Sequence, residues 1–462
     1  MSSRDMVFPI EVIDNVVVGV EEPWNNHWLP FTNLDLIVPR FEIGSFLCFK
    51  KPSNGSFSTI VNTLKASLSR ALTVYYPLAG DIIWNQAVEE KQIRCNYQGV
   101  NFVTAVADVQ LKELNFYNPN NEGIEAKLMP KKPRGVFAVQ VTELKCGGIV
   151  IGCLFDHRIA DGYSADMFIS SWANITRTGT DLPMFPSFER SYLNPRCPPI
   201  YSTSIDNMFA PFLPPSNTIN DQNDDNGDHS LVNRTFYVEG EQIKTLQLLA
   251  CENGCMRSKV EAFTSFLWKK IALSMEDSGK HNGVCNVVVA VNGRRRLSEG
   301  DGEEKEKLMA SYFGNVISMP FGSKRAQELR GMSLANVATE VHEFLQTATN
   351  KEHFLDLIDW VEEKRPQPLT SKAFAGEEMA VMVSAGQRFH TMGGIDFGWG
   401  KVAFGSCYVP SESTDFLVMI MPGPVNDEDW IVYMHLPLKH INYIEIDASD
   451  VLKPLNVHYL KL

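Results

Sequence analysis

The sequence has no apolar stretch that approaches the roughly 18 residues needed to cross a membrane as a helix, so no membrane span is expected. Its first residues, MSSRDMVFPIEVIDN, have no basic head followed by an apolar run, which indicates no secretory route and predicts a cytoplasmic protein. Basic residues are also few, since 42 Lys and Arg stand against 55 Asp and Glu, for a net charge of −13. This balance opposes binding to nucleic acid or to an anionic membrane surface, and the expected partners are small molecules.

Several catalytic signatures are missing as well. There is no GxSxG, no HExxH, no CxxC and no Cys/His cluster at metal-ligand spacing, which removes support for serine hydrolases and zinc enzymes. His435 and His440 are five apart in a strand-like segment, a spacing that would place them on opposite faces rather than on one metal. Neither GxGxxG nor GxxxxGK(S/T) occurs. We therefore expect no metal and no permanently bound cofactor.

What is present is the composition of a large globular protein. The chain has 462 residues, 44% of them hydrophobic, and strand-like and helix-like patterns alternate along it, which predicts a mixed α/β fold of two domains. Prolines crowd between residues 181 and 230, where the tail NDQNDDNGDHS is polar and acidic, as in an interdomain crossover. The predicted organisation is a first domain at 1–185, a crossover at 186–230 and a second domain at 231–462. The nine scattered cysteines suit reduced thiols in the cytosol.

The stretch CLFDHRIADGYSADMFISSWANI, residues 153–175, places a histidine at a strand-to-helix junction. The strand is the second of a predicted hairpin formed by GVFAVQVTEL and GIVIGCLFD. His157 at such a junction can act as a general base, because an imidazole titrates near neutral pH and a strand end fixes its angle. On the pattern alone, a hydrogen-bonded core histidine is equally compatible. Asp161 suits the N-cap of the following helix, or an ion pair, better than direct proton transfer.

A second conspicuous stretch is GGIDFGWGKVAFG, residues 393–405. Glycines on both sides of Trp399 permit a tight turn, and Asp396 at such a turn is expected to bond local backbone rather than a substrate. The one uninterrupted basic triple, residues 294–296, is more typical on charge alone of a solvated strand end or loop than of an anion site.

Together, HRIADG at 157–162 and DFGWG at 396–400 resemble the paired signatures of the BAHD acyltransferases of plants, which use acyl-CoA donors. Further matches run along nearly the whole chain: LDL at 34–36, YYPLAG at 75–80, SKVEAFTSFLW at 258–268, VNGRRRL at 291–297 and SYFGN at 311–315. The resemblance implies two domains of the chloramphenicol-acetyltransferase type joined by a long crossover loop. It also implies a channel between them that reaches the catalytic histidine from both faces.

The resemblance further implies that His157 is the catalytic base and that Asp161 points away from the pocket to pair with Arg294. Acyl-CoA is then a co-substrate, for which Ser258 and Lys259 at a helix N-terminus are candidate contacts. A structural role, on the CoA side of the channel and off the histidine, is implied for the five motif residues Asp396, Phe397, Gly398, Trp399 and Gly400. One chain is enough to build such a site, so a monomer is expected.

Three features depart from the family pattern. Asp81 follows PLAG in place of the usual Arg, Asn292 stands where Asp is frequent, and VSAGQRFHTMGGIDFGWG lacks the usual Trp. GQRF before DFGWG, with DWVEEKRPQP upstream, is closer to the coniferyl alcohol acyltransferase branch. The predicted reaction transfers an acyl group from acyl-CoA to the hydroxyl of a plant specialised metabolite such as a phenylpropanoid alcohol. Two alternatives stay open: acylation of an amine, such as a polyamine or alkaloid, and a non-catalytic protein that binds phenolics or CoA.

Overall fold

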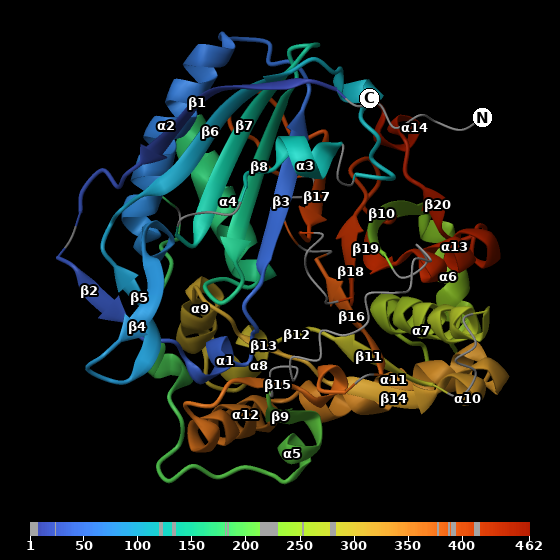
Figure 1. Ribbon diagram of the computed structural model, residues 1–462. Coiled ribbons are helices and arrows are strands. Elements are labelled where there is room, and N and C mark those ends of the chain that lie inside the picture. The colour runs from blue at the N-terminus through green and yellow to red at the C-terminus, as the bar shows by residue number, and fades with distance from the viewer. Residues whose placement is uncertain are drawn as a thin grey trace, which may run out of the picture.

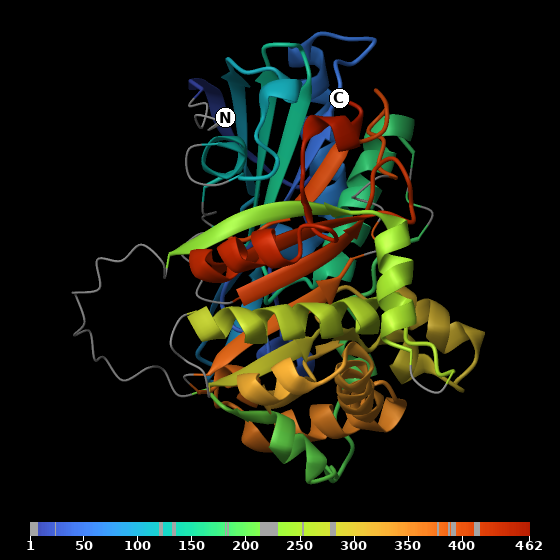
Figure 2. The same cartoon turned by 90° about the vertical axis from the view of Figure 1, so that its right-hand side faces the viewer.

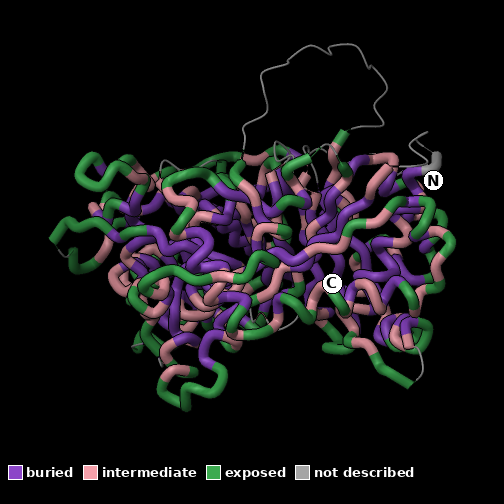
Figure 3. The backbone as a smooth tube through the Cα atoms, turned by 90° about the horizontal axis from the view of Figure 1, so that it is seen from below, coloured by how far each residue is buried: buried purple, intermediate pink, exposed green. Residues whose placement is uncertain are grey.

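The structure is a computed structural model (Figure 1). It describes residues 8–23, 25–119, 123–131, 135–180, 182, 184–212, 230–251, 254–277, 283–376, 378–386, 389, 394–410 and 416–462. Two large β-sheets and the helices packed against them form a mixed α/β fold, which confirms the predicted fold class. Figure 3 shows buried backbone gathered inside the molecule and exposed residues mainly in the outer loops. No helix within the described ranges is long and apolar enough to cross a membrane.

The first sheet has six strands within the described residues, in the order β1-β6-β7-β8-β3-β17. Their bounds are β1 Ile10–Val18, β3 Glu42–Phe49, β6 Val100–Ala107, β7 Phe137–Leu144, β8 Ile149–Asp156 and β17 Phe404–Tyr408. β7 and β8 form the predicted hairpin, in which Phe137 pairs with Phe155. Helices α2 (Phe57–Val74) and α4 (Gly162–Thr178) pack together against this sheet and share its buried core (Figure 1).

The second sheet has seven strands in the described part of the chain, in the order β14-β11-β16-β18-β19-β10-β20. Their bounds are β10 Leu231–Val238, β11 Val284–Val289, β14 Phe321–Arg325, β16 Met379–Ala385, β18 Phe416–Pro422, β19 Trp430–Pro437 and β20 Lys453–Pro454. The helices of this half are α6 Gly240–Leu249, α7 Lys259–Asp277, α10 Ala326–Gly331, α11 Leu334–Ala348 and α13 Leu438–Asp447. Helices α7 and α13 lie side by side (Figures 1 and 2) and share a second core with this sheet.

Shorter elements complete the fold around the two sheets. The helices are α1 Asn33–Leu36, α3 Ile124–Leu128, α5 Ser204–Met208, α8 Arg294–Ser298, α9 Glu303–Ser311, α12 Lys351–Lys364 and α14 Val457–Leu460. The strands are β2 His27–Leu29, β4 Asp81–Asn85, β5 Glu90–Cys95, β9 Phe209–Pro211, β12 Val291–Asn292, β13 Ile317–Ser318 and β15 Leu369–Ser371. Helix α12 forms much of the lower edge in Figure 1, where it shares a core with α1 and α5.

One strand of the first sheet comes from the second half of the sequence. β17 comes late in the chain, yet it pairs antiparallel with β3 of the first sheet, with Phe404 opposite Cys48. A buried cluster beside this pair also contains Tyr433 from β19, so the two sheets meet in a common apolar core. Backbone pairing and apolar burial therefore fix how the two halves face each other.

The crossover is partly ordered against the second half. Arg196 donates to Asp359 and Asp356 of α12, both at 2.6 Å, and β9 pairs with β15. Residues 213–229, which include most of the acidic tail, lie outside the described residues. The domain boundaries at 185 and 230 stay a prediction.

His440 does not lie in a strand, because β19 ends at Pro437 and α13 begins at Leu438. The prediction of one strand-like segment holding His435 and His440 is therefore wrong. The nine cysteines all lie in described ranges and are free thiols, of which Cys146, Cys197 and Cys255 are exposed.

Candidate active site

His157 lies immediately after β8, where the chain turns toward α4. Its backbone N–H donates to the carbonyl of Phe41 at 3.0 Å, and its carbonyl accepts from the side-chain amide of Asn315 at 3.0 Å. The imidazole is half-buried and packs on the ring of Phe41, with 4.7 Å between ring centroids. Phe41 precedes β3 and Asn315 follows α9, so residues from both halves of the chain hold His157 in place.

The surroundings of His157 favour the neutral imidazole. Burial lowers the pKa of His157 below its ordinary value of 6.5, and this outweighs the opposing effects of its own backbone, Asp161 and Asp156. The Nδ1 atom is covered and is not hydrogen-bonded to any other residue that the structure describes. An imidazole that is neutral near pH 7, with Nδ1 covered, can accept a proton at Nε2, as a general base must.

Asp161 is the N-cap of α4, since its Oδ1 accepts from the backbone N–H of Ser164 at 2.9 Å. Its two oxygens accept from the guanidinium of Arg294 at 2.7 and 3.2 Å, and Oδ2 also accepts from the backbone N–H of Val316 at 3.0 Å. Burial alone would raise the pKa of Asp161, but Arg294 and the two backbone donors lower it by more. Asp161 is thus an ionised carboxylate, and both the cap and the ion pair expected from the sequence are present.

Arg294 begins α8 and is only 4% exposed, so the expectation that this basic run is solvated is wrong for this residue. Its guanidinium also donates to Ser164 Oγ and to the Gly314 carbonyl, both at 2.9 Å. It lies over the ring of Tyr163, 4.5 Å from the centroid. No motif marks the contact between Ser164 and Gly314, which joins residues 150 positions apart. Only the folded chain reveals it.

The DFGWG motif folds into a tight loop before β17. Oδ1 of Asp396 accepts from the backbone N–H groups of Gly398 and Gly400 at 2.7 and 3.1 Å, and both glycines have positive φ, 109° and 118°. Phe397 is 1% exposed and packs edge-on against Trp172, with 5.1 Å between ring centroids. These contacts hold the loop to the first sheet, in line with a structural role.

The DFGWG loop lies at the other end of β3 from His157. β3 begins just after Phe41, which touches His157, and ends at Phe49, whose ring packs on Trp399 at 6.0 Å. An eight-residue strand spans roughly 25 Å. The structure therefore does not bring this motif to the histidine, whereas it does bring Asp161 and Arg294 next to each other a few residues beyond it.

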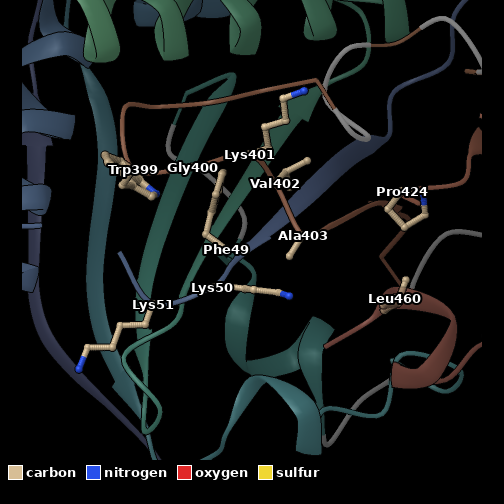
Figure 4. Close-up of a pocket in the computed structure, with 10 residues that line it drawn as sticks. All are labelled: Phe49, Lys50, Lys51, Trp399, Gly400, Lys401, Val402, Ala403, Pro424 and Leu460. Carbon is tan, nitrogen blue, oxygen red and sulfur yellow. The ribbon is translucent and has the colours of Figure 1, made fainter. Parts of the chain in front are cut away.

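A cavity of about 350 Å³ lies beside this loop (Figure 4). Its lining includes Trp399 and three lysines, Lys50, Lys51 and Lys401. Nζ of Lys50 donates to the backbone carbonyl of Lys461 at 2.9 Å. No residue of the HRIADG motif lines this cavity, so it is separate from the candidate active site.

Ser258 and Lys259 lie at the start of α7, as predicted. Ser258 Oγ accepts from the backbone N–H of Glu261 at 3.2 Å, and Oε2 of Glu261 accepts from the backbone N–H of Ser258 at 2.7 Å. The second oxygen of Glu261 lies 2.6 Å from Nδ1 of His342. The chain therefore caps this helix itself, and a CoA contact by Ser258 and Lys259 stays a prediction.

The segment that lacks the usual Trp lies partly outside the described residues, at 387–388 and 390–393. Phe389 is described, and its ring lies 2.9 Å from where a Cβ on Gly162 would stand. A second glycine, Gly386, is equally close, with 2.7 Å between its ideal Cβ and the same ring. The glycine of HRIADG is thus required by close packing of Phe389.

Two helix-covered sheets, with a histidine at the end of β8 and a buried Asp–Arg pair beside it, define the two-domain acyltransferase class, with chloramphenicol-acetyltransferase-like domains. The fold is similar to that of vinorine synthase, with a TM-score of 0.70, 20% identity and coverage of 96% of this chain and 98% of that one. A sequence profile of the Transferase family matches residues 8–451. The chain belongs to this family, the BAHD acyl-CoA-dependent acyltransferases.

Three relatives illustrate the range of the family. The chain is 29% identical to a hydroxycinnamoyltransferase of Narcissus pseudonarcissus, over 94% of this chain and 97% of that enzyme. It is 26% identical to shikimate O-hydroxycinnamoyltransferase of Nicotiana tabacum, over 94% and 98%. It is also 28% identical to anthranilate N-benzoyltransferase protein 1 of Dianthus caryophyllus, over 88% and 94%. The relatives thus include enzymes named for O-acylation and for N-acylation.

Proposed function

We propose that this acyltransferase moves an acyl group from an acyl-CoA thioester to the hydroxyl of a plant specialised metabolite, such as a phenylpropanoid alcohol. The observation that carries the proposal is the half-buried imidazole of His157, with a lowered pKa and a covered Nδ1. Such a group is unprotonated near pH 7 and is held at one angle by Phe41. The likeness to a shikimate O-hydroxycinnamoyltransferase supports a hydroxyl acceptor.

The chemistry proceeds in a ternary complex. Nε2 of His157 takes the hydroxyl proton while the acceptor oxygen bonds to the thioester carbonyl carbon. The tetrahedral intermediate collapses with cleavage of the C–S bond, and the imidazolium returns the proton to the CoA thiolate. General-base catalysis of this kind contributes roughly 10²- to 10⁴-fold, and joint binding of both substrates supplies a further large factor.

Asp161 takes no proton in this scheme. Its carboxylate is already engaged by Arg294 and by two backbone N–H groups, and its lowered pKa opposes protonation. Together with Arg294 it fixes the start of α4, which directly follows the histidine turn. Its role is therefore orientation of the segment that carries His157.

Two domains, at 1–185 and 231–462 with a crossover at 186–230, enclose a channel in which acceptor and acyl-CoA enter from opposite ends. Ser258 and Lys259 are proposed to contact CoA at the start of α7, and the DFGWG loop is proposed to have a structural role. No resident cofactor is needed, and one chain acts as a cytoplasmic monomer. GQRF and DWVEEKRPQP favour acceptors of the coniferyl alcohol type.

A second candidate is acylation of an amine. It is favoured by the 28% identity to an anthranilate N-benzoyltransferase. The same base would serve, since an attacking amine also loses a proton to His157. A protein that binds phenolics or CoA without catalysis is the third reading, and it predicts no turnover with any substrate pair.

The test is release of free CoA thiol from acetyl-, malonyl-, benzoyl- and hydroxycinnamoyl-CoA, each with coniferyl alcohol, shikimate or spermidine. Wild type is compared with His157→Ala and with His458→Ala, which removes an exposed histidine of α14. Acceptor-dependent release with an alcohol, lost only in His157→Ala while fold and CoA binding persist, supports the proposal. Release only with spermidine supports the N-acyltransferase, and full activity of His157→Ala contradicts the assigned base.

A further inference from the structure

Asn315, the last residue of SYFGN, contacts His157 from the other half of the chain. Its side chain is fully buried, and its Nδ2 donates to the carbonyl oxygen of His157 at 3.0 Å. The same Nδ2 donates its second hydrogen to Oδ1 of Asp35 at 3.0 Å, and the backbone N–H of Asn315 donates to that oxygen at 2.9 Å. Both hydrogens of the amide are therefore in use.

Asp35 fixes which way the amide of Asn315 points. Oδ1 of Asp35 accepts from both the backbone N–H and the Nδ2 of Asn315, so Nδ2 faces Asp35 and Oδ1 of Asn315 faces away. The other oxygen of Asp35 accepts from the backbone N–H and hydroxyl of Thr32 at 2.9 and 2.8 Å, which holds the carboxylate in place. Because Asp35 and Thr32 close the capping box of α1, this orientation is built into the fold.

A potential hydrogen-bond donor and a potential acceptor are both buried at this contact. Oδ1 of Asn315 and Nδ1 of His157 are both buried, and neither is hydrogen-bonded to another residue in the described part of the chain, although the ring of His157 interacts with its own backbone. If Nε2 is the base, the hydrogen of the neutral imidazole is on Nδ1, which is then a donor. Oδ1 is an acceptor. The side chain of Asn315 also acts on the ring itself, since it opposes the lowering of the pKa of His157 that burial causes.

We propose that Asn315 is a positioning residue for the catalytic step, which holds His157 by its carbonyl and presents Oδ1 as the acceptor for the Nδ1 hydrogen. This inference rests on the proposed function, because it requires His157 to act as a base through Nε2. As Nε2 takes the proton, the ring becomes a cation and the Nδ1–H becomes a stronger donor. Asn315 then stabilises the charged ring more than the neutral one. It also keeps the hydrogen of the neutral ring on Nδ1, so that Nε2 can accept a proton.

The C-terminal half of the chain thus helps to hold the catalytic histidine in position. Val316, the next residue, donates its backbone N–H to Asp161, so one short segment holds both ends of the HRIAD turn. The charged groups that act on the ring are Asp156 and Asp161, and Asp156 is paired with Arg158 at 2.6 Å. Neither of these carboxylates touches the amide of Asn315. Asp35 does, and in Asn315→Ala it loses the side-chain donor but keeps the hydrogen bond from the backbone N–H of residue 315.

The experiment compares Asn315→Ala with Asn286→Ala in the pH dependence of kcat and kcat/KM. Asn286 is a matched control, since it is 5% exposed, its Nδ2 donates to the carbonyl of Ala373 at 3.2 Å, and its Oδ1 has no partner among the described residues. Asn315→Ala is expected to lower kcat by about 100-fold with little change in either KM. The acidic limb of its kcat/KM profile, which reports the imidazole, should move to lower pH. Asn286→Ala should leave the limb in place.

The outcomes separate this proposal from the one on which it rests. Wild-type kcat and an unmoved acidic limb in Asn315→Ala, with His157→Ala inactive, overturn the positioning role alone. Activity of His157→Ala instead overturns the base and with it this inference. If Asn315→Ala does not fold, the same pH profiles are measured on Asp35→Asn. This substitution removes the carboxylate that orients the amide of Asn315, while Oδ1 of Asn315 is retained. A fall in kcat with the same shift of the limb then supports the proposal, and an unchanged profile overturns it.

Discussion

Arg294 and Asp161 are joined by two hydrogen bonds, at 2.7 and 3.2 Å, across 133 positions of sequence. Their side chains are only 4% and 3% exposed. A buried ion pair gives little net stability over apolar residues, but loss of one partner leaves an uncompensated charge in the interior. The pair therefore connects the histidine turn to α8, and removing either partner should lower the free energy of unfolding substantially.

Asp161→Asn is expected to lower the free energy of unfolding by about 3–5 kcal/mol, because it leaves Arg294 buried without its anion. Turnover should fall in parallel, since the start of α4 shifts with the pair. Urea unfolding and CoA release, measured on the same preparations, check both effects. Asp14→Asn is the control, because its ion pair with Lys65 is more exposed and should matter little. Lost turnover with unchanged unfolding would mean that Asp161 acts in the chemistry itself.

The same pair predicts a pH dependence. The pKa of Asp161 is lowered in the folded protein from an ordinary value of 3.8, so its stabilisation is complete above that value. It is lost as the pH falls below 3.8 toward the lower pKa of the folded state. The difference in unfolding free energy between wild type and Asp161→Asn should therefore shrink below about pH 4. A constant difference down to pH 3 would argue against an ionised Asp161.

Gly293 precedes Arg294, and a methyl group there would collide with a buried ring. An ideal Cβ at this position would clash with Cε1 of Phe354, which is fully buried. Gly293→Ala should lower the free energy of unfolding by about 1–3 kcal/mol through overpacking. Phe354→Leu in the same chain should recover part of the loss, as measured by urea unfolding.

Gly331→Ala serves as the matched control for that substitution. An ideal Cβ at Gly331 meets nothing within 4 Å, and its φ is not in the positive region. This change should be neutral or stabilising by about 0.4–1 kcal/mol, since it restricts the unfolded chain. Equal effects of the two substitutions would show that contact with Phe354 does not limit position 293.

Local sequence patterns predicted the parts of the site that depend on neighbouring residues. The strand into Phe155, the cap by Asp161 and the turn bonded by Asp396 each follow from residues a few positions apart. The burial of Arg294 was not predictable from charge, because it depends on how two distant halves pack. The family resemblance supplied that pairing instead.

Other parts of the site had no local signal at all. Asn315 lies in SYFGN, which matched the family pattern without any indication that its amide meets the carbonyl of His157, 158 positions away. The sequence of β17 likewise does not indicate which strand it pairs with, yet β17 completes the first sheet beside β3. Such contacts arise from tertiary pairing, which the period of apolar residues does not encode.

Glu125 on α3 is a buried carboxyl where the two sheets meet. Burial raises its pKa from 4.5 to about 8, against the lowering effect of hydrogen bonds from Asn233 at 2.5 Å and Tyr433 at 3.2 Å. Because the folded state holds the proton more tightly, this group favours folding fully below pH 4.5 and progressively less up to about pH 8. The slope approaches about 1.4 kcal/mol per pH unit in that window.

Glu125→Gln should remove this dependence, because a neutral amide has no proton to lose. Urea unfolding of wild type and variant at pH 5.5 and 8.0 measures the difference, and wild type should lose more stability over that interval. Glu113→Gln is the control for loss of a carboxylate, since Glu113 accepts from the backbone N–H of Gln110 at 2.8 Å in a local cap. Parallel pH curves for wild type and Glu125→Gln would contradict the raised pKa.

The DFGWG motif gives the last prediction, which separates a structural role from a catalytic one. Phe397 is fully buried between Trp172 and Phe49, at the opposite end of β3 from His157, so Phe397→Ala should cost about 3–5 kcal/mol of unfolding free energy. Below its unfolding transition, the variant should keep the wild-type kcat per folded molecule. Trp84→Ala removes an aromatic ring that is 55% exposed and should change stability by no more than about 0.5 kcal/mol. A fall in kcat for Phe397→Ala at wild-type stability would instead place the motif in the reaction, because packing alone acts through the fraction of folded protein.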